Sequence, residues 1–128
     1  MQYAILCYHD EKVTCAWSKE QDDAVMAKLG VVMDKLTRQG KLGPVARLLP
    51  TTAATTLRKD REQPIVIDGP FAETKEQLLG FYVVDCATHE EAVEIAHRLA
   101  GPRIAHGFGP GSLEIRPIGA AVMGSLAA

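Results

Sequence analysis

The strongest constraint on the fold is a repeated order of strands and helices in which the strands are apolar on both faces. From Gln2 to His9, and again from Leu78 to Cys86, apolar side chains occupy both the odd and the even positions. A strand of this kind needs cover on both faces. The chain therefore favours a sheet with helices packed against one face and a further partner on the other.

Two amphipathic helices accompany these strands. The first is predicted to start at the N-cap Ser18, with Gln21 as its capping-box partner, and to end at Gly40, a residue suited to the left-handed conformation that stops helices. Its buried stripe consists of Val25, Leu29, Val32, Met33 and Leu36. The second is predicted to start at the N-cap Thr88, with Glu91 completing a capping box, and to stop at Gly101-Pro102. Its buried stripe consists of Ala92, Val93, Ile95, Ala96 and Leu99.

The remaining segments complete an α+β pattern. Further strands are predicted over Leu42 to Leu49, Ala54 to Lys59, Pro64 to Asp68 and Ser112 to Ile118, and a polar connection over His9 to Trp17. The order is strand–helix–strand, an inserted β-hairpin, then strand–helix–strand, which predicts a ferredoxin-like βαβ-hairpin-βαβ sandwich with an antiparallel sheet and both helices on one face. Because the other face stays bare and apolar, we expect a homodimer that buries it about a two-fold axis.

Length, targeting signals and cysteines limit the protein class. At 128 residues we expect one domain over residues 1–118 and a small apolar tail over 119–128. The N-terminus has no basic flank and reaches His9-Asp10-Glu11 too soon for a signal peptide, and no apolar run approaches the roughly 20 residues of a membrane span. The three cysteines form no Cys-x-x-Cys pair and fit reduced thiols. These features predict a cytoplasmic protein with no membrane partner.

Charge and ligand spacings argue against nucleic acid and metals. Lys and Arg total 14 against 16 Asp and Glu, and the richest basic stretch, Arg58 to Glu62, carries its own counter-charges, so we expect no nucleic-acid partner. Glu94-x-x-His97 occurs once, whereas carboxylate-bridged metal sites need it twice, and no zinc spacing is present. The glycine-rich loop from Gly107 to Gly111 precedes a strand and indicates a turn rather than a phosphate loop. We expect no metal and no cofactor.

One polar segment, from Asp68 to Gln77, stands out between two predicted strands. Pro70 has no amide hydrogen, so strand pairing must stop there. Phe71 is followed by a dense set of polar groups: Glu73, Thr74, Lys75 and Glu76. Two interpretations remain open, a solvated hairpin loop and the lining of a pocket with coupled charges.

The string DGPFAETKEQLLGFYVVD resembles the signature of the YCII-related, or DGPF, family. The opening strand QYAILCY, the central TTLR and the closing LEIRPI fit the same layout, so the resemblance covers essentially residues 1–118. It implies a ferredoxin-like fold of the dimeric α+β-barrel type, usually dimeric, with a largely unassigned activity. Members of a smaller branch carry a histidine and an aspartate near the first helix as a proposed catalytic pair. This chain has no histidine between Ser18 and Gly40, so that pair is not transferred.

The candidate site residues come from the first strand, the hairpin and the polar segment. His9, beside two carboxylates, and Asp68 are predicted as proton carriers in acid–base chemistry without a cofactor. Arg58 or Lys75 is predicted to hold an anionic substrate. The other predicted ligand contacts are Tyr8, Phe71, Glu73 and Tyr82. Simpler interpretations stay open, namely an exposed strand end for His9, a structural ion pair with Asp68 or Glu73 for Arg58, and burial in a dimer interface for Tyr8. His106 near a pocket and Cys15 as a reactive thiol are further possibilities.

Two main functions follow from these residues. The first is a small-molecule-binding protein or enzyme whose pocket is lined by the loop from Asp68 to Glu76. The second is a non-catalytic regulatory or interaction module with an exposed Phe71, because relatives in the DGPF branch often occur with extracytoplasmic-function sigma factors. A purely structural dimer is a third. An enzyme should have Asp68, Glu73 and His9 converging on a concave cavity, whereas an interaction module should spread them over an open surface.

Overall fold

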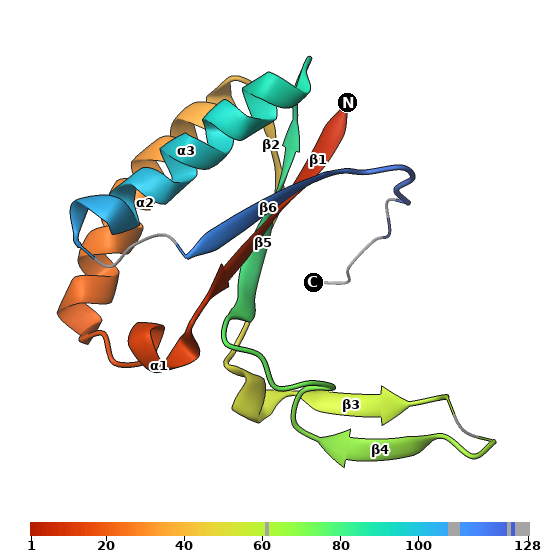
Figure 1. The fold of residues 1–128 in the computed structure, drawn as a ribbon. Helices are drawn as coiled ribbons and strands as arrows, with labels where there is room; N and C mark the ends of the chain where they lie inside the picture. Colours follow the sequence, from red (N-terminus) through yellow and green to blue (C-terminus); the bar gives the residue numbers. More distant parts are fainter. Residues whose placement is uncertain (61, 108–110, 123, 125–128) are drawn as a thin grey trace.

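The structure is a computed structural model that describes residues 1–60, 62–107, 111–122 and 124. Parts of the predicted charged turn, glycine-rich turn and apolar tail therefore lie outside the described residues. The main sheet is antiparallel, has the order β2–β5–β1–β6, and consists of β1 (Gln2–His9), β2 (Leu42–Arg47), β5 (Gln77–Asp85) and β6 (Ser112–Pro117). The helices α2 (Lys19–Arg38) and α3 (His89–Ala105) lie side by side on one face of it (Figure 1). This arrangement confirms the ferredoxin-like α+β fold, with an open sheet whose edge strands are β2 and β6.

The core fills the space between the two helices and the sheet. The largest fully buried side chains are Ile5, Val25, Leu36, Val84 and Ile95. They come from β1, α2, β5 and α3, so each layer contributes. Burying one such side chain contributes roughly 1.5–3 kcal/mol. The predicted stripe positions Val25, Leu29 and Leu36 are all buried, which confirms the orientation of the first helix.

Local signals define both ends of α2. Ser18 Oγ accepts from the Gln21 amide at 3.1 Å and Gln21 Oε1 accepts from the Ser18 amide at 3.0 Å, which confirms the capping box. Gly40 adopts φ +69°, its amide donates to Thr37, and the next amide, of Lys41, donates to the carbonyl of Leu36. This is a Schellman termination, which satisfies two carbonyls of the last turn.

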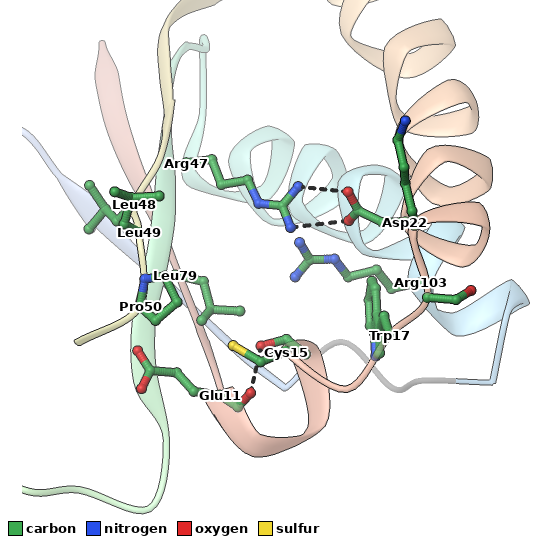
Figure 2. A pocket seen from close by; sticks show the side chains of 13 residues that line it. Glu11, Cys15, Trp17, Asp22, Arg47, Leu48, Leu49, Pro50, Leu79 and Arg103 are labelled. Carbon is green, nitrogen blue, oxygen red and sulfur yellow. Dashed lines mark hydrogen bonds and ion pairs between the residues drawn. The ribbon is translucent and has the colours of Figure 1, made fainter. Parts of the chain in front are cut away.

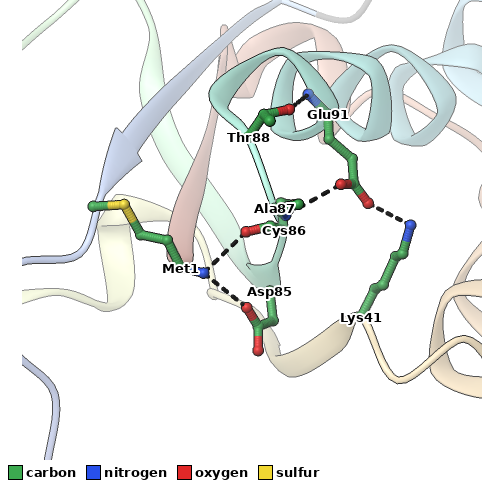
Figure 3. Close-up of polar contacts among 7 residues, drawn as sticks. All are labelled: Met1, Lys41, Asp85, Cys86, Ala87, Thr88 and Glu91. Carbon is green, nitrogen blue, oxygen red and sulfur yellow. Dashed lines mark hydrogen bonds and ion pairs between the residues drawn. The ribbon is translucent and has the colours of Figure 1, made fainter.

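The predicted stop of the second helix at Gly101-Pro102 is wrong, because α3 continues to Ala105. Pro102 is buried on the inner face of the helix together with Leu99 and Ala100. Burial of this apolar turn favours continuing the helix even though proline removes one backbone hydrogen bond. The N-cap at Thr88 is confirmed, because Thr88 Oγ1 accepts from the Glu91 amide at 3.2 Å (Figure 3). The predicted capping box is wrong, because the Glu91 carboxylate accepts from the Ala87 amide and from Lys41 Nζ instead of from the Thr88 amide.

Two further boundaries differ from the prediction. The polar connection after β1 contains a short helix, α1 (Glu11–Thr14), capped by the Asp10 carboxylate, which accepts from the Lys12 amide at 2.9 Å. Strand β2 ends at Arg47 rather than Leu49, and a short 3-10 helix, η1 (Thr51–Ala53), follows. The two short helices contact each other although they are far apart in the sequence, since the Glu11 carboxylate accepts from Thr51.

The inserted hairpin lies apart from the sandwich. Its strands β3 (Thr55–Arg58) and β4 (Ile65–Asp68) pair with each other in a separate two-stranded sheet. Figure 1 shows this hairpin extending away from the two helices. Every residue of β4 is exposed, and Leu57 of β3 is 58% exposed. The hairpin therefore presents apolar side chains to solvent in the single chain.

The face of the main sheet that is turned away from the helices is also apolar. Cross-strand pairs place alternate residues of β1 and β5 on it, and we call this set the open face: Ala4, Leu6, Tyr8, Leu78, Phe81 and Val83. These side chains are half-buried in the single chain. The predicted bare apolar face is therefore present.

Candidate functional site

A cavity of about 650 Å³ lies between α1, the start of α2, the end of β2 and the last turn of α3, and we call it the α1 cavity (Figure 2). Its apolar wall consists of Leu48, Leu49, Pro50 and Leu79. The other lining residues are Glu11, Thr14, Cys15, Trp17, Ser18, Lys19, Asp22, Arg47 and Arg103. Its size and its mixture of apolar walls with a few polar groups are typical of small-molecule sites.

A chain of polar contacts frames the cavity and begins at the DGPF segment. Gln77, the last residue of DGPFAETKEQ, accepts a hydrogen bond from the Glu11 amide through its side-chain oxygen at 2.8 Å. The Glu11 carboxylate accepts from the amide of Thr51 at 2.6 Å and from its hydroxyl at 2.7 Å. Glu11 therefore ties α1 to η1, and both of its carboxylate oxygens are already engaged.

Arg47 and Asp22 form a two-bond ion pair across the cavity. Arg47 Nη1 lies 3.2 Å from Asp22 Oδ2, and Nη2 lies 3.1 Å from Oδ1. The pair links β2 to α2. Because Arg47 is 60% exposed, the pair adds little to stability, but it neutralises the charge of Arg47.

Arg103 has a different environment. Its guanidinium carbon lies 5.6 Å from the centroid of the Trp17 ring, a cation–π contact, and the side chain is half-buried. Within the described residues no carboxylate forms an ion pair with it. Arg103 is thus a partly desolvated cation without an acidic partner in this part of the chain.

Two titratable side chains, Cys7 and Tyr82, line a smaller cavity together with Arg103 and are neutral near pH 7. Burial raises the pKa of the Cys7 thiol to about 11, although the positive charge of Arg103 opposes the shift. Burial, with a smaller contribution from Cys7, raises the pKa of the Tyr82 hydroxyl to about 12, again opposed by Arg103. Neither group carries a negative charge near neutral pH, so neither supplies a counter-ion.

Two smaller cavities accompany the first. One, of about 60 Å³, is lined by Cys7 and Tyr82 and shares Arg47, Leu79 and Arg103 with the α1 cavity. Tyr82, predicted as a ligand contact, therefore lies on the helix side of the sheet. The other, of about 330 Å³, lies between α3 and β6 and is almost entirely apolar.

The predicted site residues occupy three separate environments. His9 is buried at the end of β1, paired with Gln77 across the sheet, and its Nδ1 lies 3.3 Å from the carbonyl oxygen of Asp10. Asp68 is exposed at the end of β4, opposite Thr55. Tyr8 belongs to the open face. None of the three cavities is lined by both members of the predicted catalytic pair.

The polar segment forms a loop at the base of the hairpin. Arg58 Nη2 donates to the carbonyl of Phe71 at 2.9 Å, while the Phe71 ring is 75% exposed. Glu73 and Lys75 are also exposed. No residue of 68–76 lines any of the three cavities, so in the single chain this loop lies on an open surface.

Arg47, Arg103, Asp22 and Trp17 were not found as candidates from the sequence. Trp17 is the only tryptophan of the chain, and its place in a polar connection is a signal that could have been used. Arg103 follows Pro102, where the helix was expected to have stopped. Arg47 and Arg103 are far from Trp17 and Asp22 in the sequence, so only the folded chain shows that these residues line one cavity.

No further class of site is found in the described ranges. They contain no group of three or more His, Cys, Asp or Glu side chains able to hold a metal ion. No helix within them is long and apolar enough to cross a bilayer.

Comparison with known proteins finds a matching family model and a relative of similar length. The sequence model of the YCII-related domain matches residues 1–118. An uncharacterized protein of Rhizobium meliloti (strain 1021) is 57% identical over 118 residues, which is 92% of either chain. The match to the domain includes the sandwich, the hairpin and every residue of the α1 cavity.

Proposed function

This chain belongs to the YCII-related family, and from that premise we propose that it binds a small molecule in the α1 cavity. The observation that carries the proposal is the cavity itself. Its polar and apolar groups converge from α1, α2, β2 and α3 on a space of about 650 Å³. Such convergence of polar groups opposite an apolar wall is the usual arrangement of a binding pocket.

The acid–base chemistry predicted for His9 and Asp68 is a separate part of the proposal. Asp68 is exposed at the end of β4, whereas the carboxylates that line the α1 cavity are those of Glu11 and Asp22, which contact Thr51 and Arg47. Ligand binding in the cavity therefore does not require Asp68. We expect Asp68→Asn to leave the affinity of the α1 cavity for its ligand unchanged. A variant that binds the ligand normally but converts it more slowly would support the predicted catalytic role of Asp68.

Cys15 offers a direct test of occupancy. It is exposed and lines the α1 cavity, whereas Cys7 and Cys86 are buried. We expect a bound small molecule to slow the reaction of Cys15 with iodoacetamide, an uncharged thiol reagent, and to raise the melting temperature. The measurement is the labelling rate, by mass spectrometry, across a library of neutral and charged compounds.

The control is Cys15→Ser, which should remove the fast labelling step. Absence of both protection and thermal shift for every compound would contradict the small-molecule function. The alternative, a regulatory or interaction module built around the exposed Phe71 loop, would then be favoured.

We also propose that two copies pair through the open face and that the protein is cytoplasmic. The half-buried Leu6, Tyr8 and Phe81 support the pairing, and three free cysteines fit a reducing compartment. We expect Phe81→Glu to give a monomer in sedimentation experiments. Val31→Glu, at an exposed position of α2, should sediment with the same mass as the wild type. A wild-type chain that is monomeric at high concentration would exclude this interface.

A further inference from the structure

We propose that the ligand of the α1 cavity is a small monocarboxylate with an apolar body, and that Arg103 binds its carboxylate. This inference rests on the proposed function and adds the chemical class of the ligand and the residue that selects it.

The charges around the cavity favour a single negative charge on the ligand. Three cationic side chains and two carboxylates line it: Lys19, Arg47, Arg103, Glu11 and Asp22. Arg47 is compensated by Asp22, with which it forms both of its short contacts. One positive charge therefore remains in excess, and a monoanion would balance it.

The carboxylate of Glu11 does not serve Arg103. Both of its oxygens accept hydrogen bonds from Thr51. Figure 2 shows this carboxylate turned away from Arg103, towards the side of Pro50. Two lining cations, Lys19 and Arg103, therefore have no ion pair among the described residues. Lys19 is exposed to water and Arg103 is half-buried, so an anion gains more at Arg103.

The position of Arg103 suits a planar two-oxygen group. Figure 2 shows its guanidinium directed into the cavity, below the Arg47–Asp22 pair, with Trp17 beside it. A contact with the Trp17 ring limits the orientation of the guanidinium while its N–H edge can still donate in the plane. Two parallel N–H···O bonds to a carboxylate match this geometry.

Partial burial makes an anion more favourable at this place than in water. Arg103 lines both the α1 cavity and the small cavity beside Cys7 and Tyr82, and those two groups are uncharged near neutral pH. A cation that is partly removed from water is stabilised by an opposite charge. The start of α2 also opens onto the cavity, and the positive end of its helix dipole acts in the same direction.

The apolar wall of the cavity favours a ligand whose body is apolar. Leu48, Leu49, Pro50 and Leu79 form an apolar surface, and Leu49 is 79% exposed in the single chain. A ligand with an apolar body would remove this surface from water, whereas a small polar acid such as acetate would not. Aromatic or branched aliphatic acids fit both walls.

The test compares phenylacetate with phenylacetamide and acetate as probes on the full chain, at constant ionic strength. The readout is the concentration that halves the rate at which iodoacetamide labels Cys15. We expect phenylacetate to protect at a concentration at least about tenfold below that of phenylacetamide or acetate, a ratio that corresponds to about 1.4 kcal/mol.

Variants of Arg103 assign the preference. Arg103→Gln should abolish the difference between acid and amide, and Arg103→Lys, which keeps the charge but not the two-bond geometry, should leave part of it. Arg98→Gln is the matched control, since Arg98 lies on the same helix and does not line the cavity. Circular dichroism and the labelling rate without ligand show whether each variant is folded.

The outcomes separate the inference from the function on which it rests. Equal protection by phenylacetate and phenylacetamide, or a preference that survives Arg103→Gln, would overturn the carboxylate inference while small-molecule binding stands. Protection by neither probe also overturns it, and the function then depends on the wider library. A preference lost in Arg103→Gln and kept in Arg98→Gln supports it.

Discussion

The sandwich and the hairpin contain similar apolar residues but bury them to opposite extents. Leu36 of α2 is completely buried and Leu57 of β3 is 58% exposed, while Val84 of β5 is completely buried and Val66 of β4 is 68% exposed. The strands of the sandwich lie under α2 and α3, whereas β3 and β4 have only each other (Figure 1). An apolar sequence pattern therefore predicts side chains that favour burial, but the fold of the single chain buries only some of them.

The residues of the DGPF segment also have two different structural roles, one in the hairpin and one beside the α1 cavity. An isolated two-stranded hairpin is marginally stable in water, and here local polar bonds hold its base. The Gly69 amide donates to Ala54 at 2.7 Å, and Thr56 Oγ1 donates to the Gly69 carbonyl at 2.8 Å. Gly69 adopts φ +101°, a backbone conformation that is unfavourable for a residue with a side chain. The DGPF residues thus shape the hairpin, and the end of the segment at Gln77 supports the α1 cavity.

Hydrogen exchange should show the largest difference between the two regions. We expect the hydrogen-bonded amides of β1 and β5 to exchange only through global unfolding, for which typical domains require about 5–15 kcal/mol. The amides of β3 and β4 should exchange through local opening at a small fraction of that free energy. Mass spectrometry of peptides covering 2–9, 77–85 and 55–68 measures this. Hairpin protection that appears only at high protein concentration would show that a second copy covers it.

A pair of leucine substitutions should give the next largest effect. We expect Leu36→Ala to lower the free energy of unfolding by about 2–5 kcal/mol, because a cavity replaces a completely buried side chain. Leu57→Ala, the matched change in the hairpin, should lower it by less than about 0.5 kcal/mol. Urea denaturation at low protein concentration measures both. Equal losses would contradict the assignment of the hairpin to the surface.

The smallest expected effect is on the pH dependence of stability, through the ion pair between Lys41 and Glu91 in the sandwich. The described part of the hairpin has no such pair. The Glu91 carboxylate accepts from Lys41 Nζ and from the Ala87 amide (Figure 3). The hydrogen bond from Lys41, and next that from Ala87, lowers the pKa of Glu91 below its usual value. The stabilisation is therefore present above the pKa of the unfolded chain and is lost as the pH falls through the folded pKa.

We accordingly expect Glu91→Gln to be slightly less stable than the wild type near neutral pH and to converge with it in acid. The same hydrogen bond raises the pKa of Lys41, so its contribution disappears only as the pH rises through that raised value. Thermal denaturation between acid and neutral pH provides the measurement. Glu90→Gln, in the same turn, is the control and should run parallel to the wild type. A constant offset of Glu91→Gln at all pH values would exclude the ion pair as the cause.

Local signals account for what could be predicted of the fold. The capping box of Ser18 and Gln21, the stop at Gly40 and the first strand depend on residues a few positions apart, and all were confirmed. The errors at Pro102 and Leu49 occur where contacts with distant segments determine the boundary. The candidate site was harder to predict, because Trp17, Arg47 and Arg103 come from the connection between α1 and α2, from β2 and from α3.

The sequence by itself therefore determined the order of the strands and of the two long helices, the α+β class, the family and the presence of more apolar surface than one core can bury. Only the tertiary structure decided which of that surface stays uncovered, which carboxylates are engaged, and that Arg103 lies in a cavity without an acidic partner among the described residues. The physical reason is that caps, turns and strand patterns arise from neighbours along the chain. Burial and Coulomb interactions depend on distances in space, which the chain acquires only when it folds.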